Sequence, residues 1–256
     1  MHRSLRRQFR LSLKPRALRS LLDEQADPPR ARDVARYLKL DSREVLGLPV
    51  PAVHKTAVRF VRASGLPEDL GLLDRWFAGT FEEALCAVFF MGAQSAYTSR
   101  QWSVVERWCA APDTWALADP ISVILLAGFR GEGLIDDELL RAWIATEEPF
   151  WLRRIALVAT TAINQGGPGG PTRAQLRRLG RQPAFGEPAS ELTLELLERS
   201  IHDKRHFIRL AIGWALRVLV EIEPAGVARF VQAHRASFTR AMLNKARLDD
   251  DGRRKP

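Results

Sequence analysis

A short pattern that recurs at the ends of predicted helices constrains the fold of this chain more than any other feature. It reads LLDRW at 72–76, VVERW at 104–108 and LLRAW at 139–143, with a weaker copy, LLERS, at 196–200. The last residues of successive copies are 32, 35 and 57 positions apart. The longest interval contains the Gly-, Pro- and Arg-rich stretch 165–188, and removing about 22 of its residues restores a spacing of about 35. The sequence therefore predicts a repeat protein.

Each repeat unit contains two predicted helices. Apolar residues recur with helical spacing, and almost no segment alternates with period two. Two helices in a unit of this length are typical of HEAT-like repeats, which stack into a curved α-solenoid. The sequence thus predicts an all-α, curved α-solenoid of HEAT-like helical-pair repeats. The predicted helices are 32–40, 51–63, 70–77, 81–91, 102–110, 120–129, 136–145, 151–163, 191–201, 207–222 and 224–233.

The repeat register places four chemically distinctive residues on one stripe. Asp119 and Arg154 each lie 11 residues after the Trp that ends the preceding copy, and Trp214 lies 14 residues after the serine that ends the last. Trp115 lies four residues before Asp119, one helical turn below it if the helix predicted from 120 extends back that far. Because second helices line the concave side of a curved solenoid, these side chains are expected to share one concave surface.

Each of these residues also has a structural interpretation. Asp119 precedes Pro120 and could be the N-cap of a helix. Arg154 could form a structural ion pair with Asp119 between repeats. Trp115 and Trp214 could belong to the core.

The charge of the chain points to an anionic partner. Lys and Arg number 39 and Asp and Glu 30, which gives a net charge of +9 and favours DNA or an anionic membrane. The longest central apolar run, 121–129, is too short to span a membrane. We expect no membrane partner and predict that the concave face of the solenoid is basic and binds DNA. Candidate phosphate contacts, each of which could instead be a solvated surface charge, are His54, Lys55, Arg153, Arg209, Arg217, Arg240 and Lys245.

Cysteines and termini bear on location. Cys86 and Cys109 lie in apolar helical patterns and are expected to be buried thiols in a reducing compartment. The first 22 residues hold seven Lys or Arg and no acid, without the apolar core of a secretory signal. A mitochondrial transit peptide is one alternative, but the Arg- and Ala-rich composition favours a bacterial cytoplasmic protein. We predict a basic segment 1–30, a repeat domain 31–248 with a loop insertion at 165–188, and a flexible tail 249–256.

Two other motifs are interpreted without a metal or cofactor. His202 and His206 have i, i+4 spacing but no third ligand, so no metal site is expected. The run 166–170 has the glycines of a phosphate loop but lacks its Gly-Lys-Ser/Thr ending. We interpret it as the start of a mobile surface loop, with possible DNA contacts from Arg173, Arg177, Arg178 and Arg181.

The order of Trp, Asp, Arg and Trp resembles the AlkD-like DNA alkylation repair family, whose members are HEAT-like-repeat DNA glycosylases. The resemblance covers roughly 34 to 248 and rests on LGLPVP at 46–51, WALAD at 115–119, FWLRR at 150–154 and FIRLAIGWALR at 207–217. The chain departs from the family at Ala116 and Val218, where the family often has an acid, and in the insertion 165–188.

The resemblance implies a role for each residue of the stripe. Asp119 would be the catalytic carboxylate, and Arg154 would contact the backbone phosphate at the lesion. Trp115 and Trp214 would pack against the deoxyribose of the lesion. The resemblance also implies that no tight base-reading pocket is needed.

The residue types suit this chemistry. An N3- or N7-alkylated purine is cationic and leaves as a neutral base, so the oxocarbenium-like sugar is what needs stabilisation. One carboxylate can supply it and orient the attacking water, and each indole face beside a cation adds about 0.5–2 kcal/mol. We therefore predict a monomeric glycosylase, without cofactor, that acts on double-stranded DNA containing alkylated bases and leaves an abasic site. The alternatives are a non-catalytic solenoid that binds damaged or branched DNA, and a protein-binding scaffold.

Overall fold

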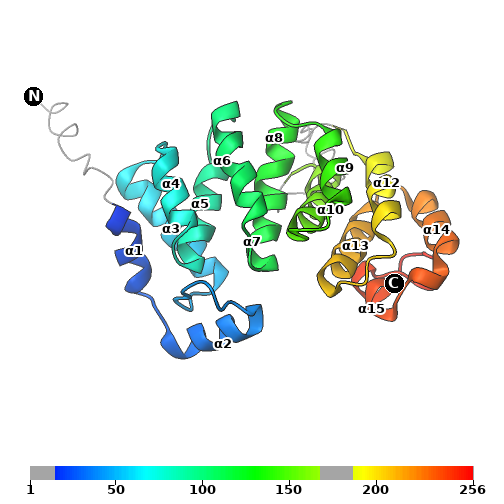
Figure 1. Ribbon diagram of the computed structural model, residues 1–256, viewed down its shortest axis with the longest axis horizontal. Coiled ribbons are helices and arrows are strands. Elements are labelled where there is room, and N and C mark those ends of the chain that lie inside the picture. Colours follow the sequence, from blue (N-terminus) through cyan, green and yellow to red (C-terminus); the bar gives the residue numbers. More distant parts are fainter. Residues whose placement is uncertain (1–14, 168–186, 256) are drawn as a thin grey trace, which may run out of the picture. The chain divides into compact units, whose positions relative to one another are not determined.

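The computed structural model describes residues 15–167 and 187–255, and nearly all regular structure in these ranges is helical. An isolated antiparallel bridge between Leu248 and Arg254 is the exception. The prediction of an all-α chain of helical repeats is confirmed (Figure 1). The chain divides into two compact units, Met1–Trp108 and Cys109–Pro256, and each is described by itself.

The first unit is built around buried aromatic side chains. Its helices are α1 (Pro15–Asp23), α2 (Pro28–Leu38), α3 (Val50–Ser64), α4 (Leu70–Phe77), α5 (Phe81–Gly92) and α6 (Ser99–Ala110), within which the second unit begins. Phe60 of α3, Trp76 of α4 and Phe90 of α5 lie with ring centroids 5.5–5.6 Å apart. Trp76 ends the first copy of the repeat pattern, and its burial explains why the pattern ends in a large apolar residue.

Two N-terminal helices differ from the sequence prediction. Helix α1 lies in the basic segment 1–30, where the sequence predicted no helix, and its Leu18 and Leu22 are fully buried. Helix α2 begins at Pro28, four residues before the predicted start. Asp27 accepts a hydrogen bond from the Arg30 amide at 3.0 Å, so an N-cap followed by proline in the first turn starts this helix.

A buried carboxylate holds the loop before α3. Glu82 of α5 is 0% exposed and accepts hydrogen bonds from the backbone N–H groups of Leu46, Gly47 and Leu48 at 2.8–3.1 Å. Gly47 has φ +88°, and a Cβ there would lie 2.4 Å from the Asp27 carbonyl oxygen. The LGLP segment is therefore fixed by a tight backbone approach and by one internal acceptor.

Replacement of Glu82 by Gln is expected to lower the free energy of unfolding by about 1.5–3 kcal/mol. Gln keeps one acceptor oxygen but turns an N–H group toward at least one of the three amides, and hydrogen bonds to a charged group are worth about this much. Urea unfolding monitored by circular dichroism measures the change. Glu44→Gln, at a largely exposed carboxylate, is the control and should cost less than about 1 kcal/mol. Equal effects of the two substitutions would contradict a central role for Glu82.

The second unit stacks its helices around α10. It contains α7 (Trp115–Pro120), the π-helical segment η1 (Ile121–Leu126), α8 (Ala127–Gly131), α9 (Asp137–Ala145), α10 (Trp151–Gln165), α12 (Ser190–Ser200), α13 (His206–Leu219), α14 (Pro224–Ala233), the 3₁₀ turn η2 (Arg235–Ser237) and α15 (Arg240–Ala246). Helix α10 packs against α7, η1, α9, α12 and α13, and α13 packs in turn against α15. Successive second helices, α10 and α13, are thus neighbours, as stacked repeats require.

The repeat pattern ends at buried positions in this unit as well. Trp143 at the end of α9 is 8% exposed and Ser200 at the end of α12 is 1% exposed. Cys86 and Cys109 are buried, as predicted. Among the described residues, no helix combines the length and apolar character that a membrane crossing requires. The arginines predicted to contact DNA from the insertion, Arg173, Arg177, Arg178 and Arg181, lie outside the described residues.

Candidate active site

Asp119 lies inside a helix and is not its N-cap. Thr114 caps α7 by accepting a hydrogen bond from the Ala116 amide at 3.3 Å, so Trp115 is the first helical residue and Asp119 follows one turn later. Pro120 has no N–H to donate and its ring crowds the preceding turn. The helix widens to the π-helical segment η1 directly after it, a local geometry that is frequent at functional sites.

Asp119 and Arg154 form a two-point ion pair. Arg154 Nε donates to Asp119 Oδ1 and Arg154 Nη2 to Oδ2, both at 2.8 Å. Arg154 Nη1 donates to the carbonyl oxygen of Phe207 at the start of α13. Arg154 is 4% exposed, whereas the Asp119 side chain keeps 14% of its surface exposed. The structural ion pair considered from the sequence is therefore present.

The guanidinium still has unused donors. Arg carries five N–H groups in a fixed fork, and the three hydrogen bonds above use three of them. The remaining two belong to Nη1 and Nη2. These two N–H groups are the donors of Arg154 that Asp119 and Phe207 do not use.

Opposing effects act on the pKa of Asp119. Burial raises it because the charged form loses solvation, while the hydrogen bonds and charge of Arg154 and the charge of Lys245 lower it. Burial prevails, and the pKa lies above the ordinary value for Asp. Ionisation of Asp119 thus depends on its two cationic neighbours, and the carboxylate is more basic than a solvated one.

Trp214 and Lys245 come together where α13 meets α15. A Cβ on Gly213 would lie 2.8 Å from both the Lys245 Cβ and the Met242 carbonyl oxygen, so glycine permits this close packing. The Lys245 ammonium lies 5.9 Å from the centroid of the Trp214 ring, within the range of a cation–π interaction. Lys245 therefore acts on both Trp214 and Asp119. Trp115 and Trp214 are half-buried, so neither belongs to the fully buried core.

Four of the predicted phosphate contacts lie on the surface of their helices. His54 and Lys55 are exposed on α3, and the His54 ring lies edge-on to Phe89 at 5.4 Å. Arg217 is exposed on α13. Arg240 is exposed at the start of α15, 3.6 Å from an Asp250 carboxylate oxygen. Their contact with DNA stays a prediction.

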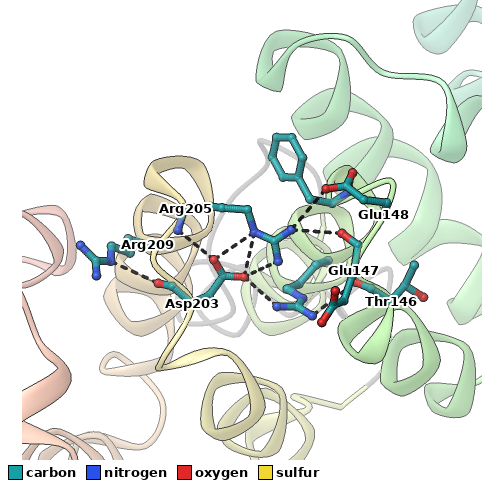
Figure 2. Close-up of polar contacts among 8 residues, drawn as sticks. Thr146, Glu147, Glu148, Asp203, Arg205 and Arg209 are labelled. Atoms are coloured by element: carbon teal, nitrogen blue, oxygen red, sulfur yellow. Dashed lines mark hydrogen bonds and ion pairs between the residues drawn. The ribbon is translucent and has the colours of Figure 1, made fainter.

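Arg153 and Arg209 are occupied by contacts within the protein. Both bind Asp203, a residue that the sequence did not single out, in the cluster drawn in Figure 2. The Arg153 side chain is only 15% exposed. A loop aspartate two residues before an arginine carries no distinctive sequence signal, so only the structure reveals this cluster.

The described residues contain no group of three or more His, Cys, Asp or Glu side chains that could hold a metal ion. A family model described as DNA alkylation repair enzyme matches residues 18–248. No curated protein matches the sequence.

Proposed function

Because the chain belongs to the DNA alkylation repair enzyme family, we propose that it is a DNA glycosylase that hydrolyses the N-glycosidic bond of N3- and N7-alkylated purines in duplex DNA. The observation that carries the proposal is the Asp119 carboxylate, partly exposed and paired with Arg154, on a helix that begins with Trp115. The product is a free base and an abasic site.

The proposed mechanism uses the charge of Asp119. As the C1′–N bond breaks, the alkylated purine takes the bonding electrons and leaves neutral, and positive charge develops on the sugar. The Asp119 carboxylate stabilises this charge and accepts a proton from the water that attacks C1′. Its raised pKa makes it a better proton acceptor than a solvated Asp.

The neighbouring residues would hold the sugar and its phosphate. The N–H groups of Arg154 that Asp119 and Phe207 do not use would donate to a phosphate oxygen. The indoles of Trp115 and Trp214 offer aromatic faces to a cationic sugar. The Lys245 ammonium adds a second cation for the DNA backbone.

Base release from methylated duplex DNA tests the proposal directly. The purified protein is incubated with DNA treated with a methylating agent, and released bases are separated and identified. We expect release of methylated purines well above the spontaneous rate. DNA binding without any release above that rate would refute the glycosylase.

One observation favours a second candidate, a non-catalytic protein that binds damaged or branched DNA. Arg154 is almost fully buried and forms a two-point ion pair with Asp119, which is what a purely structural pair would show. This candidate predicts salt-sensitive DNA binding, no base release and no dependence of any activity on Asp119.

Removal of a surface cation is expected to change the salt dependence of DNA binding. Arg217→Ala should weaken binding similarly for all sequences and lower the slope of log K against log salt by about 1, because one fewer phosphate counterion is released. Fluorescence anisotropy at several salt concentrations measures the slope. Arg229→Ala removes an Arg of α14 whose side chain is 75% exposed and serves as the matched control. An unchanged slope for Arg217→Ala would remove this residue from the interface.

A further inference from the structure

Three arginines converge on Asp203 in the loop between α12 and α13 (Figure 2). The Asp203 side chain is 4% exposed. Its carboxylate accepts hydrogen bonds from Arg153 Nη1 at 2.7 Å and from Arg205 Nη2 at 2.6 Å, and it also accepts the Arg205 backbone N–H at 2.9 Å. Arg209 Nε donates to the main-chain carbonyl oxygen of Asp203 at 3.1 Å. We call these four residues the Asp203 clamp.

The clamp ties two loops together. Arg205 reaches the loop between α9 and α10, where its Nη1 donates to the Glu147 carbonyl oxygen at 3.0 Å and its guanidinium lies 5.5 Å from the centroid of the Phe150 ring. Arg153 Nη2 donates to the Thr146 carbonyl oxygen at 3.3 Å in the same loop. One buried carboxylate therefore orients two arginines that both hold the neighbouring loop, as Figure 2 shows.

Two residues of the clamp, Arg153 and Arg205, lie close in the chain to the two groups that form the Arg154–Phe207 hydrogen bond. Arg154 follows Arg153 on α10. Phe207, whose carbonyl oxygen accepts from Arg154 Nη1, lies two residues after Arg205. A shift of Arg153 or of Arg205 would move one partner of this hydrogen bond, and with it the guanidinium that holds Asp119.

We propose that Asp203 is a positioning residue of the active site. By holding Arg153 and Arg205, it fixes the Phe207 carbonyl group and the Arg154 guanidinium, and through them the Asp119 carboxylate. The catalytic consequence rests on the proposed glycosylase function, whereas the effect on the Asp119–Arg154 pair does not.

The charge of Asp203 is what makes the clamp stable. Burial opposes its ionisation, but hydrogen bonds from Arg205 and Arg153 outweigh burial and lower the pKa of Asp203 below the ordinary value. Asp203 is therefore ionised at every pH at which Asp119 is ionised. Replacement by Asn would remove the carboxylate that Arg153 and Arg205 share. Arg205 would keep the more distant Glu148 carboxylate at 3.9 Å, and the two guanidinium groups would repel one another.

Titration of the Asp119 carboxyl group in the free protein tests the proposal without any assay of activity. The groups that lower its pKa are Arg154 on α10 and Lys245 on α15. If Asp203→Asn loosens Arg154, the pKa of Asp119 should rise above its wild-type value, which ¹³C NMR of the labelled carboxyl group measures. Asp203→Glu keeps the charge, so the pKa of Asp119 should rise less in this variant than in Asp203→Asn.

A second aspartate offers a matched control. Asp137 accepts hydrogen bonds from Arg130 Nε at 2.6 Å and Nη2 at 3.1 Å, in the same unit. Asp137→Asn makes the same chemical change at an arginine pair that joins α8 to α9. It should leave the titration of Asp119 and the excision rate as in the wild type.

The excision assay distinguishes positioning from DNA binding. We expect Asp203→Asn to lower the single-turnover excision rate at saturating protein by about 10- to 100-fold, because a small misplacement of a catalytic group has this cost. The Kd for DNA should change much less than the excision rate, because Arg154 is only one of the proposed phosphate contacts. An excision rate that is normal at saturation, with weakened binding, would instead assign the clamp to the DNA contact and overturn the proposal.

Other outcomes are also decisive. An Asp119 titration that is unchanged by Asp203→Asn overturns the proposal. If that variant does not fold, Arg205→Lys keeps the charge but loses the fork-shaped contact, and the same titration decides. A wild-type protein that releases no base, in which Asp203→Asn still shifts the Asp119 titration, would refute the glycosylase and retain the clamp.

Discussion

The Asp119→Asn variant is expected to bind duplex DNA nearly as well as the wild type and to lose most of its excision. Asn has almost the same shape but no charge, so the developing positive charge on the sugar loses its counter-ion and the water loses its proton acceptor. Loss of one preorganised electrostatic contact of this kind lowers the rate by roughly 100- to 1,000-fold. Single-turnover release of methylated purines measures the rate, and anisotropy with the same duplex measures the Kd.

Two controls separate chemistry from folding in this variant. The carbonyl oxygen of the introduced amide can still accept one hydrogen bond from Arg154, so the thermal unfolding midpoint should fall only moderately. Asp137→Asn, at the Arg130 pair, makes the same substitution away from the site and should excise normally. Normal excision by Asp119→Asn would exclude this carboxylate from the mechanism.

The Arg154→Ala variant is expected to lose about 3–5 kcal/mol of stability at neutral pH, because its removal leaves the buried Asp119 carboxylate without a partner. The pKa of Asp119 should then rise further above its already raised value, since the hydrogen bonds and charge of Arg154 are what lower it. Excision should also fall, because less Asp119 is ionised and the proposed phosphate contact is lost.

The pH dependence of this variant has a definite sign. When the pKa of an Asp is higher in the folded than in the unfolded state, the folded state binds the proton more tightly. Stability therefore falls as the pH rises from the unfolded value, about 4, through the folded value. We expect the unfolding midpoint of Arg154→Ala to fall more steeply over this range than that of the wild type, as calorimetry would show.

The double variant Asp119→Asn/Arg154→Ala completes the test. It removes the carboxylate that Arg154→Ala leaves unpaired, so it should be more stable at neutral pH than Arg154→Ala and lose the additional pH dependence. The coupling energy of the cycle gives the strength of the pair. If Arg154→Ala unfolds like the wild type at every pH, the pair contributes nothing to stability or to the ionisation of Asp119.

Much of the helical framework was predictable from local signals. The bounds of α4 and α14 agree with the prediction residue for residue, because an acidic N-cap residue begins each helix and apolar periodicity covers it. Helix α15 was not predicted, although Thr239 caps it and accepts the Met242 amide at 3.3 Å. Its seven residues are too few for a clear period, and packing against α13 stabilises it.

The sequence alone was enough to predict that the chain is all-α and where the repeat pattern ends. These features depend on residues close in the chain, whose spacing fixes which face of a helix is apolar. Three contacts are settled by the folded structure and not by the sequence: Arg154 pairs with Asp119 across 35 positions, α15 brings Lys245 to Trp214, and Asp203 binds Arg153 across 50 positions. Such contacts depend on how neighbouring helices cross and how closely they approach, as at Gly213. Periodicity identifies the buried face of a helix but not the side chain that meets it.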